Sequence, residues 1–197
     1  MTRPQFDPQP LTLAGAHARL EPLARSHAPA LFAIGQDAPI WTWMLGRAWE
    51  RESDAASMVE GALAEQARGQ RVPFVILTPG GDVAGTTSYL DIRRIDRGLE
   101  IGHTWLGTAS QRTAINTECK LMLLTHAFEA LGAARVQLKT DSRNARSRAA
   151  IERLGAQFEG LLRAFQLRFD GTWRDTAIYS ITREDWPGVK AGLSARH

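Results

Sequence analysis

The residues that could do chemistry most directly are 111–118, Gln-Arg-Thr-Ala-Ile-Asn-Thr-Glu, which run into a helix-like segment from Glu118 to Leu131. A loop of small and polar residues that opens a helix exposes backbone N–H groups with no partner inside the helix. Their partial positive charge suits a phosphate or a pyrophosphate. We therefore predict an anion site here, and the neighbouring residues must decide which phosphate ligand it takes.

Two titratable side chains precede this loop in a strand-like segment, residues 99–106. Both Glu100 and His103 could act as a general base, and the pKa of an unperturbed histidine is already near neutrality. Strand alternation places them on opposite faces, unless a bulge at Gly102 shifts the count. The structural alternatives are a surface carboxylate for Glu100 and a packed ring for His103.

The basic charge is spread along the chain, with a net charge of +3 and a pI of about 9.5. One local concentration contains Arg143, Arg146, Arg148 and Arg153. Such a cluster suits either nucleic acid or the phosphates of a nucleotide-like cofactor. No nucleic-acid recognition motif accompanies it, so nucleic acid is the disfavoured partner.

Composition favours a globular, cytoplasmic protein with one domain. The chain has 197 residues, of which 44% are hydrophobic and 23% charged, which is ordinary for a single globular domain. No apolar run approaches the roughly 20 residues of a membrane span, and residues 1–10 lack the apolar core of a signal peptide. Cys119 is the only cysteine, so neither an internal disulfide nor a multi-cysteine zinc site is expected, and no metal is predicted.

The elements that must position these residues alternate between strands and helices. Strands are predicted at 11–20, 72–78, 83–92, 99–106, 135–140, 162–169 and 173–181, and helices at 26–34, 53–68, 118–131 and 144–154. The hairpins require antiparallel pairing, whereas the strand–helix–strand unit from 99 to 140 indicates a parallel pair. This order predicts an α+β (mixed α/β) domain with its core at about 11–186 and a loosely held tail after Pro187.

Three segments in this order resemble the GNAT superfamily of N-acetyltransferases, in particular its RimJ/RimL-type branch. The acetyl-CoA loop of that family reads Gln/Arg-x-x-Gly-x-Gly/Ala, often followed in this branch by Thr-Glu-Ala. Gln111 matches the first position, whereas Ala114 and Asn116 replace the two small residues, and Thr117-Glu118-Cys119 follow. Residues 99–106 resemble the family's fourth strand, and residues 144–155 resemble its Asn-x-x-Ser…Leu-Gly-Phe segment.

The resemblance implies a mostly antiparallel central sheet that is splayed between its fourth and fifth strands, with helices on both faces. Acetyl-CoA, or another acyl-CoA, would be the cosubstrate, with its pantetheine in the splay. The residues that the resemblance places at this cosubstrate are Trp105, Leu106, Gln111, Arg112, Thr113, Ala114, Ile115, Asn116, Thr117, Asn144 and Ser147.

The resemblance also assigns catalytic roles. Glu100 precedes Gln111 at the spacing at which histone-acetylating members place their glutamate base, so it is the leading general base, with His103 as the rival. No tyrosine follows Asn144 within a turn or two, and Ser147 is therefore the expected acid for the departing thiolate. Cys119 falls where family members have alanine, which favours a small buried thiol over an acyl-cysteine.

The amine acceptor and its pocket are left open by the sequence. The residues that could line the pocket, or simply pack the core, are Trp41, Trp43, Met44, Trp49 and Tyr89. Arg163 and Arg174 are candidates to hold an acidic group of the acceptor or of the acyl chain. The acceptor could be a small molecule or a protein N-terminus, and the branch suggests a homodimer.

The prediction is thus an enzyme that transfers an acetyl or related acyl group directly from acyl-CoA to a primary amine. The alternative is a catalytically inactive module that binds acyl-CoA or regulates, motivated by the altered loop at Ala114 and Asn116.

Overall fold

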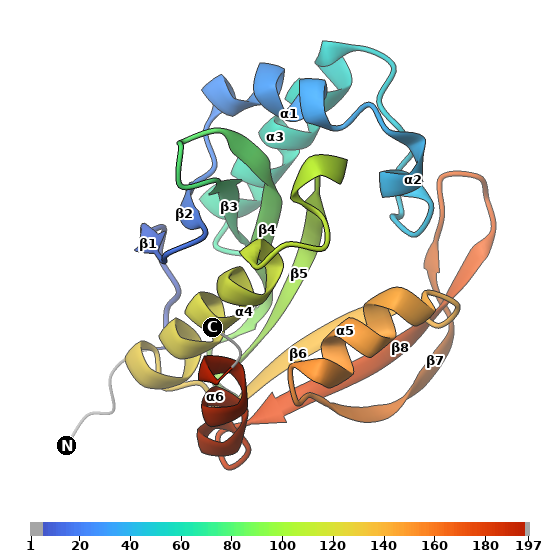
Figure 1. Cartoon of the computed structure of the whole chain (residues 1–197). Helices are drawn as coiled ribbons and strands as arrows, with labels where there is room; N and C mark the ends of the chain where they lie inside the picture. The colour runs from blue at the N-terminus through green and yellow to red at the C-terminus, as the bar shows by residue number, and fades with distance from the viewer. Residues whose placement is uncertain (1–5, 196–197) are drawn as a thin grey trace.

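A single mixed sheet of eight strands organises the computed structural model, which describes residues 6–195 (Figure 1). The strand order is β1-β2-β3-β4-β5-β6-β8-β7. The strands are β1 (Leu13–Ala14), β2 (Arg19–Pro22), β3 (Val72–Leu77), β4 (Val83–Arg93), β5 (Gly98–Leu106), β6 (Arg135–Asp141), β7 (Gln157–Leu167) and β8 (Trp173–Thr182). All neighbouring strands are antiparallel except β5 and β6, which confirms the predicted mixed α/β fold.

Helices cover both faces of this sheet, as predicted. They are α1 (Ala28–Ile34), α2 (Ala38–Trp41), α3 (Glu52–Ala67), α4 (Ile115–Thr125), α5 (Ala145–Arg153) and α6 (Trp186–Ser194). Strand β3 shows how the faces differ: Phe74 and Ile76 belong to the core under α4 and α6, whereas Val75 and Leu77 belong to the core under α1 and α3. This alternation follows from the two-residue period of a strand. In residues 6–195, no helix has the length and apolar character to cross a membrane.

The predicted splay is present between β5 and β6, which correspond to the fourth and fifth strands of the family pattern. These strands pair only from Gly98↔Arg135 to Glu100↔Gln137, and beyond Glu100 they separate (Figure 1). A bulge in β5 accompanies the separation, because Thr86 pairs with Trp105 while Ser88 already pairs with Gly102.

The bulge was expected at Gly102, but the residue with left-handed backbone is His103, with φ of 47°. Histidine is one of the non-glycine residues that are enriched in this region. The extra residue also changes the strand alternation after Gly102, so the predicted division of residues 99–106 between two faces holds only before the bulge.

Two further expectations about the ends of the chain need correction. The predicted strand 11–20 is interrupted, because Glu118 accepts hydrogen bonds from the N–H groups of Ala16 (2.8 Å) and His17 (2.6 Å) and holds a turn there. The core also extends beyond 11–186: Phe6 is 2% exposed, and the expected loose tail is α6, with Leu193 1% exposed. Trp186, Val189 and Leu193 lie on one helical face, a spacing that signals a packed helix.

Candidate active site

The loop predicted to hold phosphate leads into the N-terminus of α4. This helix begins at Ile115, earlier than predicted, with Ala114 as its N-cap. The Thr113 hydroxyl accepts a hydrogen bond from the Ile115 N–H (3.3 Å), and the Ile115 side chain is buried in the core. Within residues 6–195, the N–H groups of Asn116 and Thr117 donate to no protein acceptor. These donors at the positive end of the helix can receive an anion.

The two replaced small residues do not distort this loop. Ala114 has φ of −66° and ψ of −19°, a conformation that any residue adopts. Asn116 lies inside α4. The left-handed residue of the loop is Arg112, with φ of 62°. The altered loop therefore keeps its helix-opening geometry, which weakens the argument for an inactive module.

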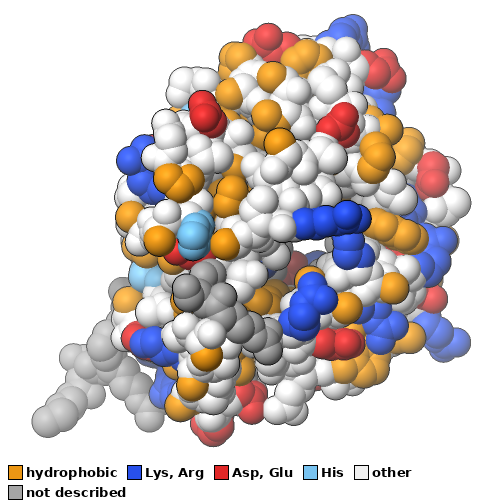
Figure 2. Space-filling model, in the orientation of Figure 1, with side chains coloured by type: hydrophobic (Ala, Val, Ile, Leu, Met, Phe, Trp, Pro, Cys, Tyr) orange, Lys and Arg blue, Asp and Glu red, His pale blue; other side chains and the backbone are white. Residues whose placement is uncertain are grey.

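A pocket of about 230 Å³ opens beside this helix N-terminus, between the start of α4, the end of α5 and α6. Its lining residues are Ala114, Asn116, Thr117, Ala150, Arg153, Leu154 and Leu193. Figure 2 shows a hollow in this face of the molecule with Lys and Arg side chains around it. The free N–H groups and nearby cations fit a phosphate-bearing ligand such as CoA.

Gln111 connects the two separated parts of the sheet. Its Nε2 donates to the Leu106 carbonyl at the end of β5 (3.0 Å), and its Oε1 accepts from Arg146 of α5 (3.1 Å). A pantetheine amide that bonds the Leu106 carbonyl would therefore share this oxygen with Gln111. The Trp105 side chain faces away, packed against Trp41 and Trp49 with ring centroids 5.6 and 5.3 Å apart, so only its backbone is available to pantetheine.

Glu100 is deeply buried, with 2% exposure, at the last residue of β5 that pairs with β6. Its neighbours Leu99 and Ile101 belong to the core under α4, so its carboxylate points to the opposite face. Oε2 contacts Lys139 Nζ (2.9 Å) and accepts from Gln137 Nε2 (3.4 Å). The carboxylate is thus fixed beside the splay, on the face opposite the core under α4.

Gly102 makes room for this carboxylate. A Cβ at Gly102 would lie 2.5 Å from Glu100 Oε1 and 3.0 Å from Leu90 Cδ1, so Gly102→Ala must displace the carboxylate. We expect kcat/KM for amine acetylation to fall by about 10- to 100-fold, with the Kd for acetyl-CoA unchanged in calorimetry. Gly61→Ala is the control, because a Cβ there meets nothing within 4 Å. Wild-type kcat/KM in Gly102→Ala would contradict the assignment.

The rival base, His103, is exposed to solvent, although surrounding protein atoms desolvate its imidazole. Desolvation, followed by the charge of Arg71, lowers the pKa of its imidazole to about 4. The ring is therefore neutral at pH 7, but it is a weak proton acceptor. The structure brings it to the α3 side of β5, where Arg71 and Glu65 also lie.

Asn144 and Ser147 open α5 next to the splay. Asn144 Oδ1 accepts from the Ser147 N–H (3.0 Å) as the N-cap of the helix, which gives this residue a structural role beside any contact with the cosubstrate. The Ser147 side chain is half-buried, and within residues 6–195 its hydroxyl makes no hydrogen bond. The alternative, in which the hydroxyl bonds the first turn of the helix, is not observed.

Sequence reasoning missed Lys120, which follows Cys119 in α4. Lys120 is 6% exposed and donates to Thr104 Oγ1 on β5 (2.7 Å). Burial lowers the pKa of its ammonium to about 8, so a buried cation lies beside the bulge. Cys119 itself is fully buried, and burial raises the pKa of its thiol to about 12, as expected for an inert packed thiol. Lys120 lies two residues after Glu118 in α4, so the two side chains point to opposite sides of the helix. This spacing is the signal that could have placed Lys120 against the sheet.

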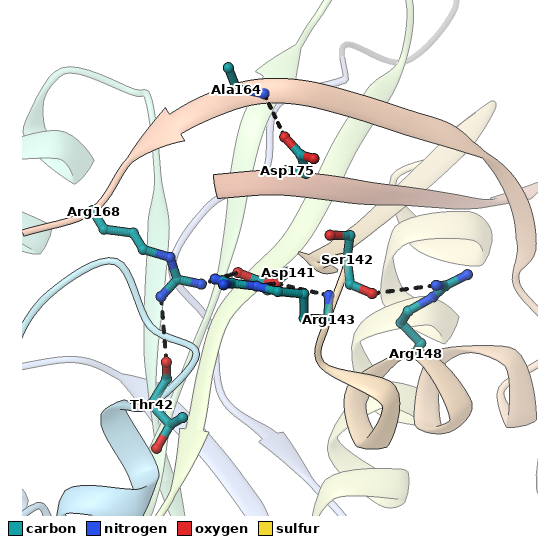
Figure 3. A network of polar contacts seen from close by, with 8 residues as sticks. All are labelled: Thr42, Asp141, Ser142, Arg143, Arg148, Ala164, Arg168 and Asp175. Carbon is teal, nitrogen blue, oxygen red and sulfur yellow. Dashed lines mark hydrogen bonds and ion pairs between the residues drawn. The ribbon is translucent and has the colours of Figure 1, made fainter. Parts of the chain in front are cut away.

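Polar residues gather at the end of β6, on the same face as Glu100. Asp141, 1% exposed, pairs with Arg143 (3.1 Å) and with Arg168 of the β7–β8 hairpin. Figure 3 shows Arg168 reaching Asp141 with one nitrogen and the Thr42 carbonyl with the other. Arg174 lies nearby and is 7% exposed, whereas Arg163 is exposed and is not part of this group.

The aromatic residues proposed for the acceptor pocket lie in three different places. Trp41 and Trp49 are buried and pack against each other with tilted rings, whose centroids are 4.5 Å apart, and they belong to the core under α1 and α3. For Tyr89 the alternative of a core residue holds, because it is buried on the opposite face and its hydroxyl donates to the Leu123 carbonyl (2.6 Å). Trp43 remains half-buried, under the guanidinium of Arg143.

Comparison with known proteins gives the chain a family context. Residues 17–157 match the acetyltransferase (GNAT) domain family. A segment of 110 residues, 56% of this chain, is 33% identical to "Putative ribosomal N-acetyltransferase YdaF" of Bacillus subtilis (strain 168), and it spans only 59% of that relative. A putative acetyltransferase from T. thermophilus is 40% identical, with a TM-score of 0.88 over 96% of this chain and 98% of its own. Mycobacterium smegmatis RimJ in complex with CoA-disulfide is 28% identical, with a TM-score of 0.78 over 91% and 88%.

Proposed function

This chain belongs to the GNAT acetyltransferase family, as its sequence predicts, and we propose that it transfers an acetyl group from acetyl-CoA to the N-terminal amine of a protein. The name of the relative YdaF, a putative ribosomal N-acetyltransferase, supports a protein as the acceptor. Residues Gln111–Thr117 and the start of α5 would hold the cosubstrate, which supplies the activated acetyl group.

The observation that carries the proposal is the position of Glu100 relative to the anion loop. The loop opens α4, on one face of the sheet, while the Glu100 carboxylate points to the other. Because β5 and β6 separate just after Glu100, the gap between them joins the two sides. An amine approaching from the α3 side can therefore meet an acyl group held from the α4 side.

The reaction requires two proton-handling roles and a group that stabilises negative charge. A primary amine is mostly protonated at pH 7, so Glu100 would take a proton from it, directly or through water. The neutral nitrogen then attacks the thioester carbonyl, a C–N bond forms and the C–S bond breaks. The second amine proton would reach the departing thiolate through the Ser147 hydroxyl, which takes up that proton as it gives up its own, and the buried Lys120 ammonium would stabilise negative charge that develops nearby.

The test is acetyl transfer to peptides. The purified chain is mixed with acetyl-CoA and peptides that carry either a free or a blocked N-terminus, and mass spectrometry locates the added group. We expect acetylation of the free α-amine and none of the blocked peptides, even where these contain lysine. Transfer only to lysine side chains or to small amines would contradict the proposed acceptor.

The same material tests the inactive module. Calorimetry with acetyl-CoA measures cosubstrate binding independently of turnover. Binding without transfer to any amine would support the module, whereas the intact geometry of the loop around Ala114 and Asn116 leads us to expect both binding and turnover.

A further inference from the structure

Unsatisfied polar atoms concentrate on the β7–β8 hairpin. Among the described residues, seven buried side-chain nitrogen or oxygen atoms lack a hydrogen-bond partner. Four of them belong to this hairpin: Gln166 Oε1, Arg168 Nε, Arg174 Nε and Thr176 Oγ1. Burying such groups without partners costs free energy, so a cluster of them marks a place where a polar group from outside the chain can bind.

Arg174 is the centre of this cluster. It is 7% exposed, and its side chain makes no hydrogen bond or ion pair with any residue from 6 to 195. Gln166 is its cross-strand partner in β7, and Thr176 lies two residues further along the same face of β8. Ala177 and Tyr179 pack into the core under α4, so Arg174 points to the other face, where Glu100 lies.

Charge on this face is unbalanced. Two carboxylates, Asp141 and Glu100, meet four cations, of which Arg143, Arg168 and Lys139 already pair with them. Arg174 forms no ion pair with either carboxylate, although the charges of Asp141 and Glu100 both act to raise its pKa, and its guanidinium remains protonated in a protein. Its positive charge also acts on His103, because it contributes to the lowered pKa of that imidazole. The missing partner is therefore an anion.

We propose that Arg174 binds a carboxylate that the acceptor carries close to its reacting amine, so that the enzyme prefers proteins with an acidic second or third residue. This inference rests on the proposed function. A guanidinium presents parallel N–H donors that match a carboxylate. Arg174 and Glu100 share one face of the sheet, so a single extended peptide can place its amine at Glu100 and a nearby side chain at Arg174.

The test compares peptides that differ only by aspartate or asparagine at the second or third position, with acetyl-CoA as donor. Wild-type enzyme should show a kcat/KM about 10- to 100-fold higher for the aspartate peptide. Arg174→Gln should reduce this preference to less than about 3-fold, with little change for the asparagine peptide. Arg163→Gln, on the same hairpin but exposed, should retain the preference. Because Arg174 has no partner to lose, Arg174→Gln should melt no lower than wild type.

Two further measurements make each outcome decisive. Calorimetry with the acetylated product peptides and CoA should give the same aspartate preference, which separates failure of this inference from failure of acetyl transfer itself. A wild-type enzyme without aspartate preference in either measurement overturns the inference, as does an equal loss for both peptides in Arg174→Gln. Succinyl-CoA with the asparagine peptide tests whether the carboxylate instead belongs to the acyl group. A preference for succinyl-CoA over acetyl-CoA that depends on Arg174, without any preference for the aspartate peptide, would place the carboxylate on the acyl group and overturn the proposal.

Discussion

Glu100→Gln is expected to lower kcat/KM for peptide acetylation by about 100- to 1,000-fold, because the amide cannot accept the proton of the amine. The substitution keeps the size of the side chain, which is fixed at the splay by Lys139 and Gln137. The Kd for acetyl-CoA should not change, since the anion loop lies on the opposite face. Steady-state kinetics and calorimetry on the same preparations measure both quantities.

Two companion variants sharpen this result. Glu65→Gln removes another carboxylate from the same side, one that pairs with Arg71, and should leave kcat/KM within about 3-fold of wild type. His103→Asn keeps a residue that tolerates the left-handed backbone, and should cost less than about 10-fold, because the imidazole is a weak base. A larger loss in His103→Asn than in Glu100→Gln would transfer the role of base to His103.

Asp141→Asn is expected to reduce the free energy of unfolding by about 3–5 kcal/mol, because it leaves a buried guanidinium without its counter-charge. Asp141 is 1% exposed, and its partner Arg168 is 7% exposed. Urea denaturation should show a midpoint lower by about 2 M. Asp175→Asn is the matched control: Asp175 is exposed, accepts a single hydrogen bond from the Ala164 N–H (2.7 Å), and should cost about 1 kcal/mol or less.

Coupling and pH provide a second check on Asp141. Arg168→Met should lower the free energy of unfolding much less in the Asp141→Asn background than in wild type, because Asp141→Asn has already removed the carboxylate that this substitution would leave unpaired.

Burial alone would raise the pKa of Asp141, but hydrogen bonds from Arg143 and the charge of Arg168 lower it overall. The stabilisation of the fold by the Asp141 carboxylate is therefore present above its unfolded pKa of 3.8 and is lost as pH falls through the lower pKa of the folded state. The difference in the free energy of unfolding between wild type and Asp141→Asn should thus narrow only below about pH 4. Equal free energies of unfolding at pH 7 would contradict the stabilising role of Asp141.

Local patterns in the sequence were sufficient for the elements and the family. Residues 111–118 predict a helix N-terminus that can hold an anion, and the β3–β4 and β7–β8 hairpins follow from their turn residues. The helix start and the two hairpins are confirmed, because turn conformations and strand alternation depend on residues close together in the chain. The same locality explains why α6 was missed: its apolar spacing was present, but only packing against the core distinguishes a short terminal helix from a loose tail.

The arrangement of side chains around the gap was decided by the tertiary structure. Glu100 and Lys139 meet because two distant strands pair for three residues and then separate, and Asp141 meets Arg168 across a hairpin. Tyr89, expected near the acceptor, lies on the other face for the same reason. The face that a strand residue occupies depends on the strand register and on the bulge at His103. Both are fixed by packing against residues that are distant in the chain, so they cannot be predicted from a local pattern. The sequence by itself thus determined the family and the loop that opens α4, whereas only the folded sheet decided which carboxylate stands at the gap and which buried arginine side chain there is left without a hydrogen-bond partner.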